Sequence, residues 1–439
     1  MITSDPVRLV GDHLLPGDEA GTVIEGGAID IDGAGRITAV GPESDLPPGP
    51  PVRRIGGLLL PGLVNAHAHT PMTLVRSVGD GLSLQRWLTE GVWPLEAGMS
   101  ADDARWGMVL GSAEMLLAGV TTSCEMYLHE EAVVEAVVET GARLVITPGV
   151  IAGLSPGGDP GQRLDQIDRF RAAHHDPDNR ISVGYAPHSV YDLSPEMCGR
   201  IAERARATGS VVHIHLEETR TERDEVGQRW GASATRLLAD AGFFEGPALA
   251  AHGVWLDADD RRILAGAGAA VAHCPQSNLK LGSGVAPVVE LLADGVRVAL
   301  GTDGPASNDD LDLWEELRLA PLLARGVHHD PTVLSAAMAL RLATAEGGAA
   351  LGLPDVGQLR PGAWADVVRL DLDHPAFSPL LADRLVSQLV FAGSARAVTH
   401  VWVAGRPVVV DGQLTTVDVP RAMAEVQRRA AGLVARAAR

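Results

Sequence analysis

The chain has 439 residues, of which 46% are hydrophobic and 21% are charged, and its formal net charge at pH 7 is −20. The acidic balance argues against nucleic acid or an anionic membrane surface as a partner, since both require a basic face. No apolar run approaches the roughly 18 residues that span a bilayer, and the first residues lack the pattern of a secretory signal. Three widely separated cysteines, Cys124, Cys198 and Cys274, indicate reduced thiols, so we expect a cytoplasmic protein.

Each end of the chain contains a predicted β-hairpin, in which two short strands flank a turn of small or acidic residues. The four strands are residues 28–31, 36–40, 398–403 and 406–410. We predict that residues 1–60 and 355–420 combine into one small β-sandwich domain.

The last segment, residues 421–439, places four apolar side chains at helical spacing, with arginines on the opposite face. These side chains are Met423, Val426, Ala430 and Leu433. We therefore predict a C-terminal helix that packs on the body of the protein.

Between the two ends, eight apolar runs alternate with helical patterns. The runs are residues 63–69, 120–126, 144–150, 181–186, 211–216, 248–254, 269–273 and 296–301. Because eight strands alternating with helices make a (β/α)8 barrel, we predict an α/β fold with a TIM-like barrel over residues 61–354. The active site of such a barrel lies at the carboxyl ends of its strands.

Histidines and one aspartate stand at the ends of six of the eight predicted strands. They are His67, His69, His188, His213, His215, His252, His273 and Asp303. The period of two in a strand puts His67 and His69 on one face, and His213 and His215 likewise. Burying so many polar groups without partners is costly, and a bound cation removes that cost.

Four of these residues form the metal-ligand set that we predict: His67, His69, His215 and Asp303. Three neutral nitrogens and one carboxylate oxygen suit Zn²⁺ or Fe²⁺. A divalent ion with an open position lowers the pKa of a bound water from about 15.7 toward about 7, which is typical of hydrolytic sites. This chemistry also needs a proton carrier, and Glu218 follows His215 closely enough to lie beside the ion without binding it.

Seven motifs spread over nearly the whole chain resemble one family. They are PGLVNAHAHTPMTLVRS at 61–77, WPLEAGM at 93–99, GYAPHSVY at 184–191, HIHLEET at 213–219, AAHGVWL at 250–256, HCPQSNLKLGSGVAP at 273–287 and GTDGPASNDDLDLWEELRLA at 301–320. They resemble the amidohydrolase superfamily and its branch of mononuclear aminohydrolases, most closely the 5′-methylthioadenosine/S-adenosylhomocysteine deaminases. Their order is highly specific for the superfamily and moderately specific for the substrate.

The resemblance implies a reaction and a role for each site residue. The four ligands would hold one divalent ion, usually zinc, and Asp303 would also take the proton of the attacking water. Glu218 would protonate the ring nitrogen beside the carbon that bears the amino group, and His252 would hydrogen-bond the attacking hydroxyl. The expected reaction is hydrolytic deamination of an adenosine derivative to the inosine analogue and ammonia.

The position of the single lysine, Lys280, bears on the number of metal ions. Relatives that hydrolyse cyclic amides or phosphotriesters commonly bridge two metals with a carboxylated lysine on the fourth strand. Here the fourth predicted strand, residues 181–186, contains no lysine. A mononuclear site is therefore favoured.

The resemblance also implies substrate contacts from Trp87 to the heterocycle or sugar, from Glu96 to the ribose hydroxyls and from His188 to the purine or ribose. Members that take S-adenosylhomocysteine present two arginines to its carboxylate. This chain has Thr147-Pro148-Gly149 at the first position, and Arg163 could stand at the second. A neutral 5′ substituent, as in methylthioadenosine, 5′-deoxyadenosine or adenosine, is therefore as well supported as the homocysteine adduct.

Two other functions compete with nucleoside deamination. The same chemistry could act on guanine, a pterin or a triazine that loses amine or chloride, and a Glu96 directed away from the metal would favour this alternative. A catalytically inactive scaffold would have lost ligands, and none of the key side chains is missing. Family relatives commonly form homo-oligomers, so we expect one here.

Overall fold

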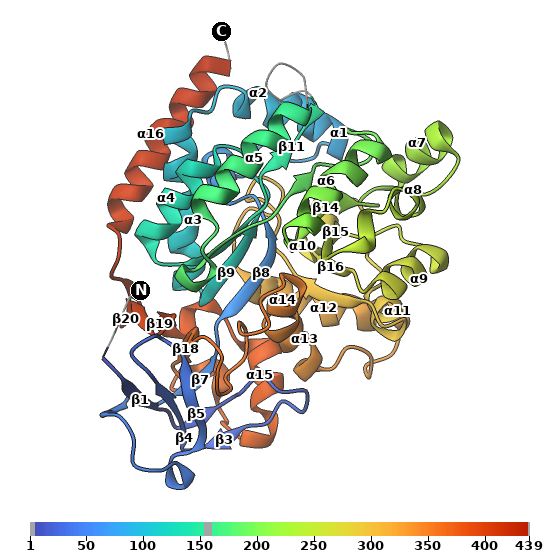
Figure 1. Cartoon of the computed structure of the whole chain (residues 1–439). Coiled ribbons are helices and arrows are strands. Elements are labelled where there is room, and N and C mark those ends of the chain that lie inside the picture. Colours follow the sequence, from blue (N-terminus) through green and yellow to red (C-terminus); the bar gives the residue numbers. More distant parts are fainter. Residues whose placement is uncertain (1–4, 153–159, 438–439) are drawn as a thin grey trace.

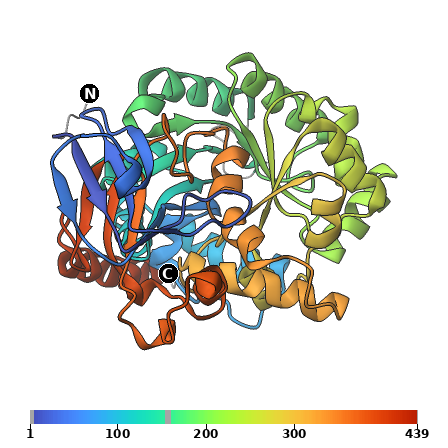
Figure 2. The same cartoon turned by 90° about the horizontal axis from the view of Figure 1, so that it is seen from below.

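The structure is a computed structural model that describes residues 5–152 and 160–437 (Figure 1). It is a mixed α/β fold in which strands and helices alternate through the middle of the chain. Strands from the two ends of the chain lie together at one side of the molecule, where the blue and orange-to-red segments meet (Figures 1 and 2).

The alternating part contains two four-stranded parallel sheets. The first has the order β12-β10-β9-β8 and the second the order β14-β15-β16-β17. Their bounds are β8 Leu63–Ala68, β9 Val120–Glu125, β10 Arg143–Ile146, β12 Ile181–Val183, β14 Val212–Leu216, β15 Ala248–His252, β16 Ala270–His273 and β17 Arg297–Leu300. Isolated parallel bridges pair Ala68 with Asp303 and Tyr185 with Val212, so each outer edge of one sheet meets an edge of the other.

The predicted strands at 144–150 and 181–186 are each interrupted, and the prediction of two continuous strands was wrong. Two-residue strands, β11 Gly149–Val150 and β13 Ala186–Pro187, pair with each other beyond the breaks. Pro148 lies in the first break and has no N–H to donate to a ladder. Gly184 lies in the second, where a Cβ would come within 2.5 Å of the Val211 carbonyl oxygen.

Helices lie on the outside of these strands (Figures 1 and 2). Their bounds are α3 Ala101–Leu117, α4 Glu130–Thr140, α5 Pro160–His174, α6 Pro195–Ala207, α7 Arg220–Trp230, α8 Ala234–Asp240, α9 Ala258–Ala267, α11 Val288–Ala293 and α12 Leu313–His328. Several start at side-chain caps. The capping box of α3, for example, is formed by Ser100 and Asp103.

The ends of the chain share a seven-stranded sheet of order β21-β20-β19-β18-β7-β2-β3, beside a four-stranded sheet of order β5-β4-β1-β6. The bounds are β1 Val7–Val10, β2 His13–Leu14, β3 Ile24–Glu25, β4 Gly27–Ile31, β5 Ile37–Pro42, β6 Val52–Arg54, β7 Leu58–Pro61, β18 Val367–Leu370, β19 Val398–Val403, β20 Arg406–Val410 and β21 Gln413–Leu414. Both predicted hairpins are confirmed, as β4–β5 and β19–β20.

Strand β7 connects the terminal sheets to the rest of the protein through its alternating side chains. Leu59 packs in a cluster with Leu9 and Ile29 of the four-stranded sheet. Leu58 and Leu60 belong to the large cluster that fills the body of the protein. The seven-stranded sheet is thus apolar on both faces, which explains why residues 58–60 are a continuous apolar run.

The C-terminal helix is α16, Val419–Ala437, and the last two residues of the predicted segment, 438–439, lie outside the described residues. It packs on α3 and buries Ala422, Val426 and Leu433. Met423, which we expected on the packed face, is 57% exposed. Val426 and Leu433 are buried as predicted, and Ala422 takes the place expected for Met423, so the contact stripe is shifted only at its N-terminal end.

The parallel and terminal sheets are joined by a buried ion pair that predicts a large stability effect. Arg143 of β10 donates to both carboxylate oxygens of Asp366, at 2.9 and 3.1 Å, and both side chains are almost fully buried. Replacing Asp366 with alanine leaves the guanidinium buried and unpaired, so we expect a loss of about 3–5 kcal/mol in urea unfolding. Replacing Glu90, which pairs with Arg86 at the surface, should cause no measurable change.

Among the described residues, no helix is both long and apolar enough to cross a membrane.

Candidate active site

The predicted metal ligands converge at the carboxyl ends of β8, β14 and β17. Asp303 Oδ1 lies 3.4 Å from His67 Nε2 and 3.3 Å from His69 Nε2, and His69 Nε2 lies 3.2 Å from His215 Nε2. Two atoms bound tetrahedrally to one Zn²⁺ at about 2.0–2.1 Å are about 3.3–3.4 Å apart, so these spacings fit a shared ion. The His67 Nε2 atom is buried and has no hydrogen-bond partner among the described residues, as expected of a ligand atom.

In His69 and His215, the ring nitrogen that does not face the site contacts a backbone carbonyl oxygen. The Nδ1 atom of His69 is 2.5 Å from the Met126 carbonyl oxygen, and that of His215 is 3.0 Å from the His188 carbonyl oxygen. Because a carbonyl can only accept, Nδ1 carries the proton and Nε2 presents its lone pair to the site. Burial also lowers the pKa of His67 to about 4, which keeps this imidazole neutral.

Asp303 follows β17 with a left-handed backbone, φ 63°. Its Oδ2 accepts hydrogen bonds from Ser277 Oγ at 2.6 Å and Ser307 Oγ at 2.8 Å, which leaves Oδ1 directed at the histidines. Burial alone would raise the pKa of this carboxyl, but its contact with His67 holds the pKa well below the usual value. Asp303 is therefore an ionised oxygen donor.

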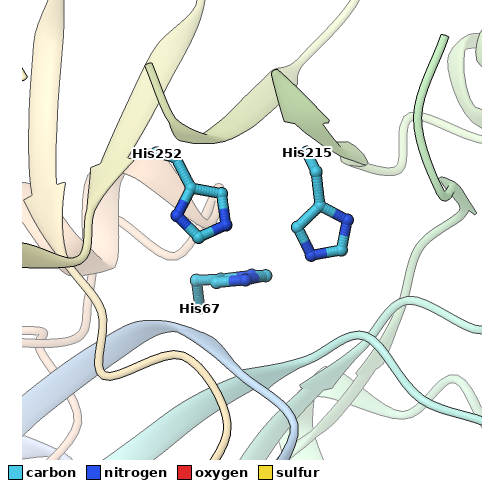
Figure 3. Close-up of side chains that lie close together, drawn as sticks. All are labelled: His67, His215 and His252. Atoms are coloured by element: carbon cyan, nitrogen blue, oxygen red, sulfur yellow. The ribbon is translucent and has the colours of Figure 1, made fainter. Parts of the chain in front are cut away.

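His252 also faces this space, as Figure 3 shows for the rings of His67, His215 and His252. One ring nitrogen from each of these three residues lies within 4.8 Å of the other two. His252 Nδ1 is 2.9 Å from Asn278 Oδ1, and its Nε2 is 3.8 Å from Glu218 Oε2. His252 thus lies between the predicted ligands and the predicted proton carrier.

Glu218 is buried, and its carboxyl group makes only long contacts with described residues. Ser283 Oγ is 3.5 Å from its Oε1, and His252 Nε2 is 3.8 Å from its Oε2. Burial, together with the charge of Asp303, raises the pKa of Glu218 to about 8. In this environment the carboxyl group holds a proton at neutral pH and has free hydrogen-bonding capacity for a substrate.

These groups open into a cavity with a largely apolar wall. Its lining includes Met72, Leu84, Trp87, Leu88, Trp93, Glu96, Met126, Tyr127, Leu128, Ile151, His188, Tyr191 and Leu281 beside the polar groups described above. The predicted contacts Trp87, Glu96 and His188 are all on this wall. Glu96, at the end of α2 (Trp93–Glu96), accepts a hydrogen bond of 2.7 Å from Tyr127.

Arg163 lies outside this cavity. Its guanidinium donates to both carboxylate oxygens of Glu130, at 2.8 and 3.1 Å, and to the Gly149 carbonyl oxygen at 3.1 Å. It lines a separate, more open hollow beside α4 and α5. The cation is therefore already paired and does not face the space that the site residues share.

His273 also differs from the expectation that strand-end histidines converge. It shares the outer face of β16 with Val271 and lines a hollow beside α11 and α12. Cys274, the next residue, is a buried thiol, as the sequence indicated.

His213 has a position that we did not assign from the sequence. Its Nε2 lies 3.0 Å from His67 Nδ1, and its Nδ1 lies 3.2 Å from Thr147 Oγ1. The sequence could have indicated this position, because the two-residue spacing puts His213 on the same strand face as the predicted ligand His215. The chain from Thr147 through His213 orients the His67 ring.

Replacing His213 with alanine should therefore weaken metal binding without removing a ligand. Partners of ligand histidines typically contribute 10- to 100-fold to metal affinity, and we expect a change of that size. Competition with a chromophoric chelator measures it. His273→Ala is the matched control, since this buried strand-end histidine does not contact the site. Equal affinity in the His213 variant and the wild type would contradict the assigned contact.

Residues 58–408 match the Amidohydrolase family, and the chain belongs to this family. The 5-methylthioadenosine/S-adenosylhomocysteine deaminase of Pelotomaculum thermopropionicum is 41% identical over 405 residues, covering 91% of this chain and 92% of the relative. The enzyme of the same name from Moorella thermoacetica is 42% identical over 416 residues, covering 93% and 96%.

Two solved structures extend the similarity to the fold. An adenosine deaminase from Xanthomonas campestris with bound zinc has a TM-score of 0.92 and 33% identity, covering 98% of each chain. The atrazine chlorohydrolase TrzN from Arthrobacter aurescens TC1, complexed with zinc, has a TM-score of 0.88 and 25% identity, covering 97% of this chain and 100% of that one.

Proposed function

We propose that this protein is a zinc-dependent deaminase that hydrolyses the 6-amino group of adenosine derivatives and releases ammonia and the inosine analogue. The observation that carries the proposal is the convergence of three imidazoles and one carboxyl group beside a buried glutamic acid whose pKa is raised to about 8 by burial. The names of the relatives and the zinc in the Xanthomonas deaminase support the substrate class and the metal.

His67, His69, His215 and Asp303 would hold the ion. When bound, a divalent cation supplies Lewis acidity that lowers the pKa of water and makes it nucleophilic near neutrality. Asp303 accepts the proton of the attacking water, and His252 orients the hydroxyl group through its Nε2. Glu218 gives its proton to the ring nitrogen next to the reacting carbon, and this proton neutralises the negative charge that develops on that nitrogen.

Trp87, Glu96 and His188 bind the nucleoside in this proposal. A carboxylate that accepts two vicinal hydroxyls discriminates more strongly than apolar contact, and Tyr127 holds Glu96 on the cavity wall. Glu96 therefore favours a nucleoside over a free base or a triazine, although TrzN shows that the fold also hosts triazine chemistry.

The cavity also favours a neutral 5′ substituent. No lysine or arginine is among the described residues that line it, and the sequence of residues 153–159 contains neither. Arg163, the candidate that the sequence offered, is paired with Glu130. The carboxylate of S-adenosylhomocysteine would meet apolar side chains and acidic groups, whereas a methylthio group would meet Leu84, Leu88 or Ile151.

An ammonia-release assay on zinc-loaded protein tests both parts of this proposal. The panel is methylthioadenosine, S-adenosylhomocysteine, 5′-deoxyadenosine, adenosine, guanine and melamine. We expect methylthioadenosine, 5′-deoxyadenosine or adenosine to have the highest kcat/KM. Faster turnover of guanine or melamine than of every nucleoside would contradict the substrate class. A preference for S-adenosylhomocysteine would contradict only the inference that the cavity favours a neutral 5′ substituent.

We further propose that the two parallel sheets form one (β/α)8 barrel over residues 61–354, supported by the two bridges between their edges. Residues 1–60 and 355–420 would form the β-sandwich, supported by the apolar cluster that the terminal sheets share.

A further inference from the structure

Glu218 presents a structural problem, because its carboxyl group must be held in place although its side-chain contacts are long. A proton donor that is free to serve the substrate gains little orientation from its own hydrogen bonds. Its position must then come from the backbone from which it projects. That backbone, residues 217–219, is the turn between β14 and α7.

The turn is held by another glutamate. Glu222 is 1% exposed, and its Oε2 accepts the backbone N–H of Glu218 at 2.8 Å while its Oε1 accepts the N–H of Glu217 at 3.2 Å. Glu217 has a left-handed backbone, φ 51°, which is uncommon for a residue with a side chain. The two hydrogen bonds hold this conformation at the residue directly before the proton carrier.

Glu222 is itself placed by the start of the helix. Thr219 caps α7 by accepting the N–H of Glu222 at 3.1 Å. In an ordinary capping box, the third helical residue binds the N–H of the cap residue. Here the carboxyl group of Glu222 reaches back to the two residues before the cap. A standard helix-capping pattern is therefore used to fix the segment that carries Glu218.

We propose that Glu222 is a positioning residue for the proton transfer made by Glu218, and this inference rests on the proposed function. Glu222 does not face the cavity and acts only through the backbone of residues 217 and 218. Its effect should appear in the chemical step, because a donor displaced by about 1 Å can cost about a hundredfold in rate. Substrate affinity should change little.

The test is a double-mutant cycle with the zinc-loaded full-length chain. Glu222→Gln keeps the size of the side chain but replaces one of the two acceptor oxygens with a donor. We expect kcat to fall about 10- to 100-fold, with KM within about threefold and one zinc per chain retained. In a Glu218→Gln background, assayed at high enzyme concentration, adding Glu222→Gln should lower kcat by less than about twofold.

Asp103→Asn is the matched control. Asp103 is a buried carboxylate at the same position of α3, where it binds the N–H of Ser100 at 3.1 Å. Its loss should lower the melting temperature while kcat stays within about twofold. If Glu222→Gln folds poorly, Glu222→Asp serves instead, because the shorter side chain keeps the carboxyl group but cannot reach both amides. It should show a smaller loss of kcat in the same direction.

The outcomes distinguish a failure of the proposed function from a failure of the positioning role of Glu222. A wild-type chain that releases no ammonia from any nucleoside refutes the proposed function. An active wild type with unchanged kcat in the Glu222 variants refutes the positioning role alone. Equal losses from Glu222→Gln with and without Glu218 would also refute it, because Glu222 would then act independently of the proton donor.

Discussion

Replacing Glu218 with glutamine lowers kcat for the preferred nucleoside by about 10²- to 10⁴-fold, the usual contribution of a general acid. The amide keeps the size and the hydrogen-bonding reach of the side chain but has no transferable proton. Because Glu218 is not one of the four predicted ligands, and its 3.8 Å contact is with His252, which is not a ligand either, the zinc content should stay at one per chain. Steady-state kinetics and metal analysis on the same preparation check both expectations.

The pH dependence of the wild type gives a second readout for Glu218. Burial raises the pKa of this carboxyl group to about 8. The protonated form is the donor, so activity should fall about tenfold per unit once the pH exceeds that pKa. A bound cation stabilises the carboxylate, which places this limb at or below pH 8. The Glu218→Gln variant should lack the limb.

Glu225→Gln is the control for these measurements, because Glu225 is exposed on α7, the helix that follows the turn carrying Glu218. Its kcat should match that of the wild type. An unchanged kcat in Glu218→Gln would remove this residue from the mechanism, and a retained alkaline limb would assign the titration to another group.

That the four predicted metal ligands lie close together could be expected from the sequence, because two sequence patterns are local. His67 lies on β8 and His69 follows directly after the last residue of that strand, so the two-residue spacing expected of a strand brings their rings together. His215 stands at the end of another predicted strand, two residues after His213. The alternation of strands and helices brings the ends of these strands, and Asp303, to the same edge of the fold. Short-range periodicity and fold class together were enough to place these four side chains.

The features that the sequence did not reveal depend on long-range packing. Arg163 could be placed near the substrate by order in the chain, but its partner Glu130 stands 33 residues away, and only the folded chain shows that the two are paired. His273 was expected at the mouth because it ends a strand. Its side chain has the parity of Val271 and faces the helices instead. Met423 was misplaced because the docking face of α16 depends on α3.

Removal of the metal should abolish turnover. Dialysis of the protein against a strong chelator leaves His67 Nε2 buried without a partner, and the ionised Asp303 loses its compensating charge. We therefore expect activity below the detection limit, full recovery with one equivalent of Zn²⁺, and a lower melting temperature for the metal-free chain. Saturation at a hundred times the dissociation constant should stabilise the fold by about 2.7 kcal/mol.

Two alanine variants of buried strand-end histidines make this test specific. His67→Ala deletes a predicted ligand, so its melting temperature should no longer respond to Zn²⁺ and its turnover should not recover. His273→Ala deletes an imidazole that is equally buried but faces the helices. It should lose stability through the cavity left behind, yet keep the response to zinc. A His67 variant that still binds one equivalent and regains turnover would contradict the four-ligand site, because the remaining three groups would then suffice.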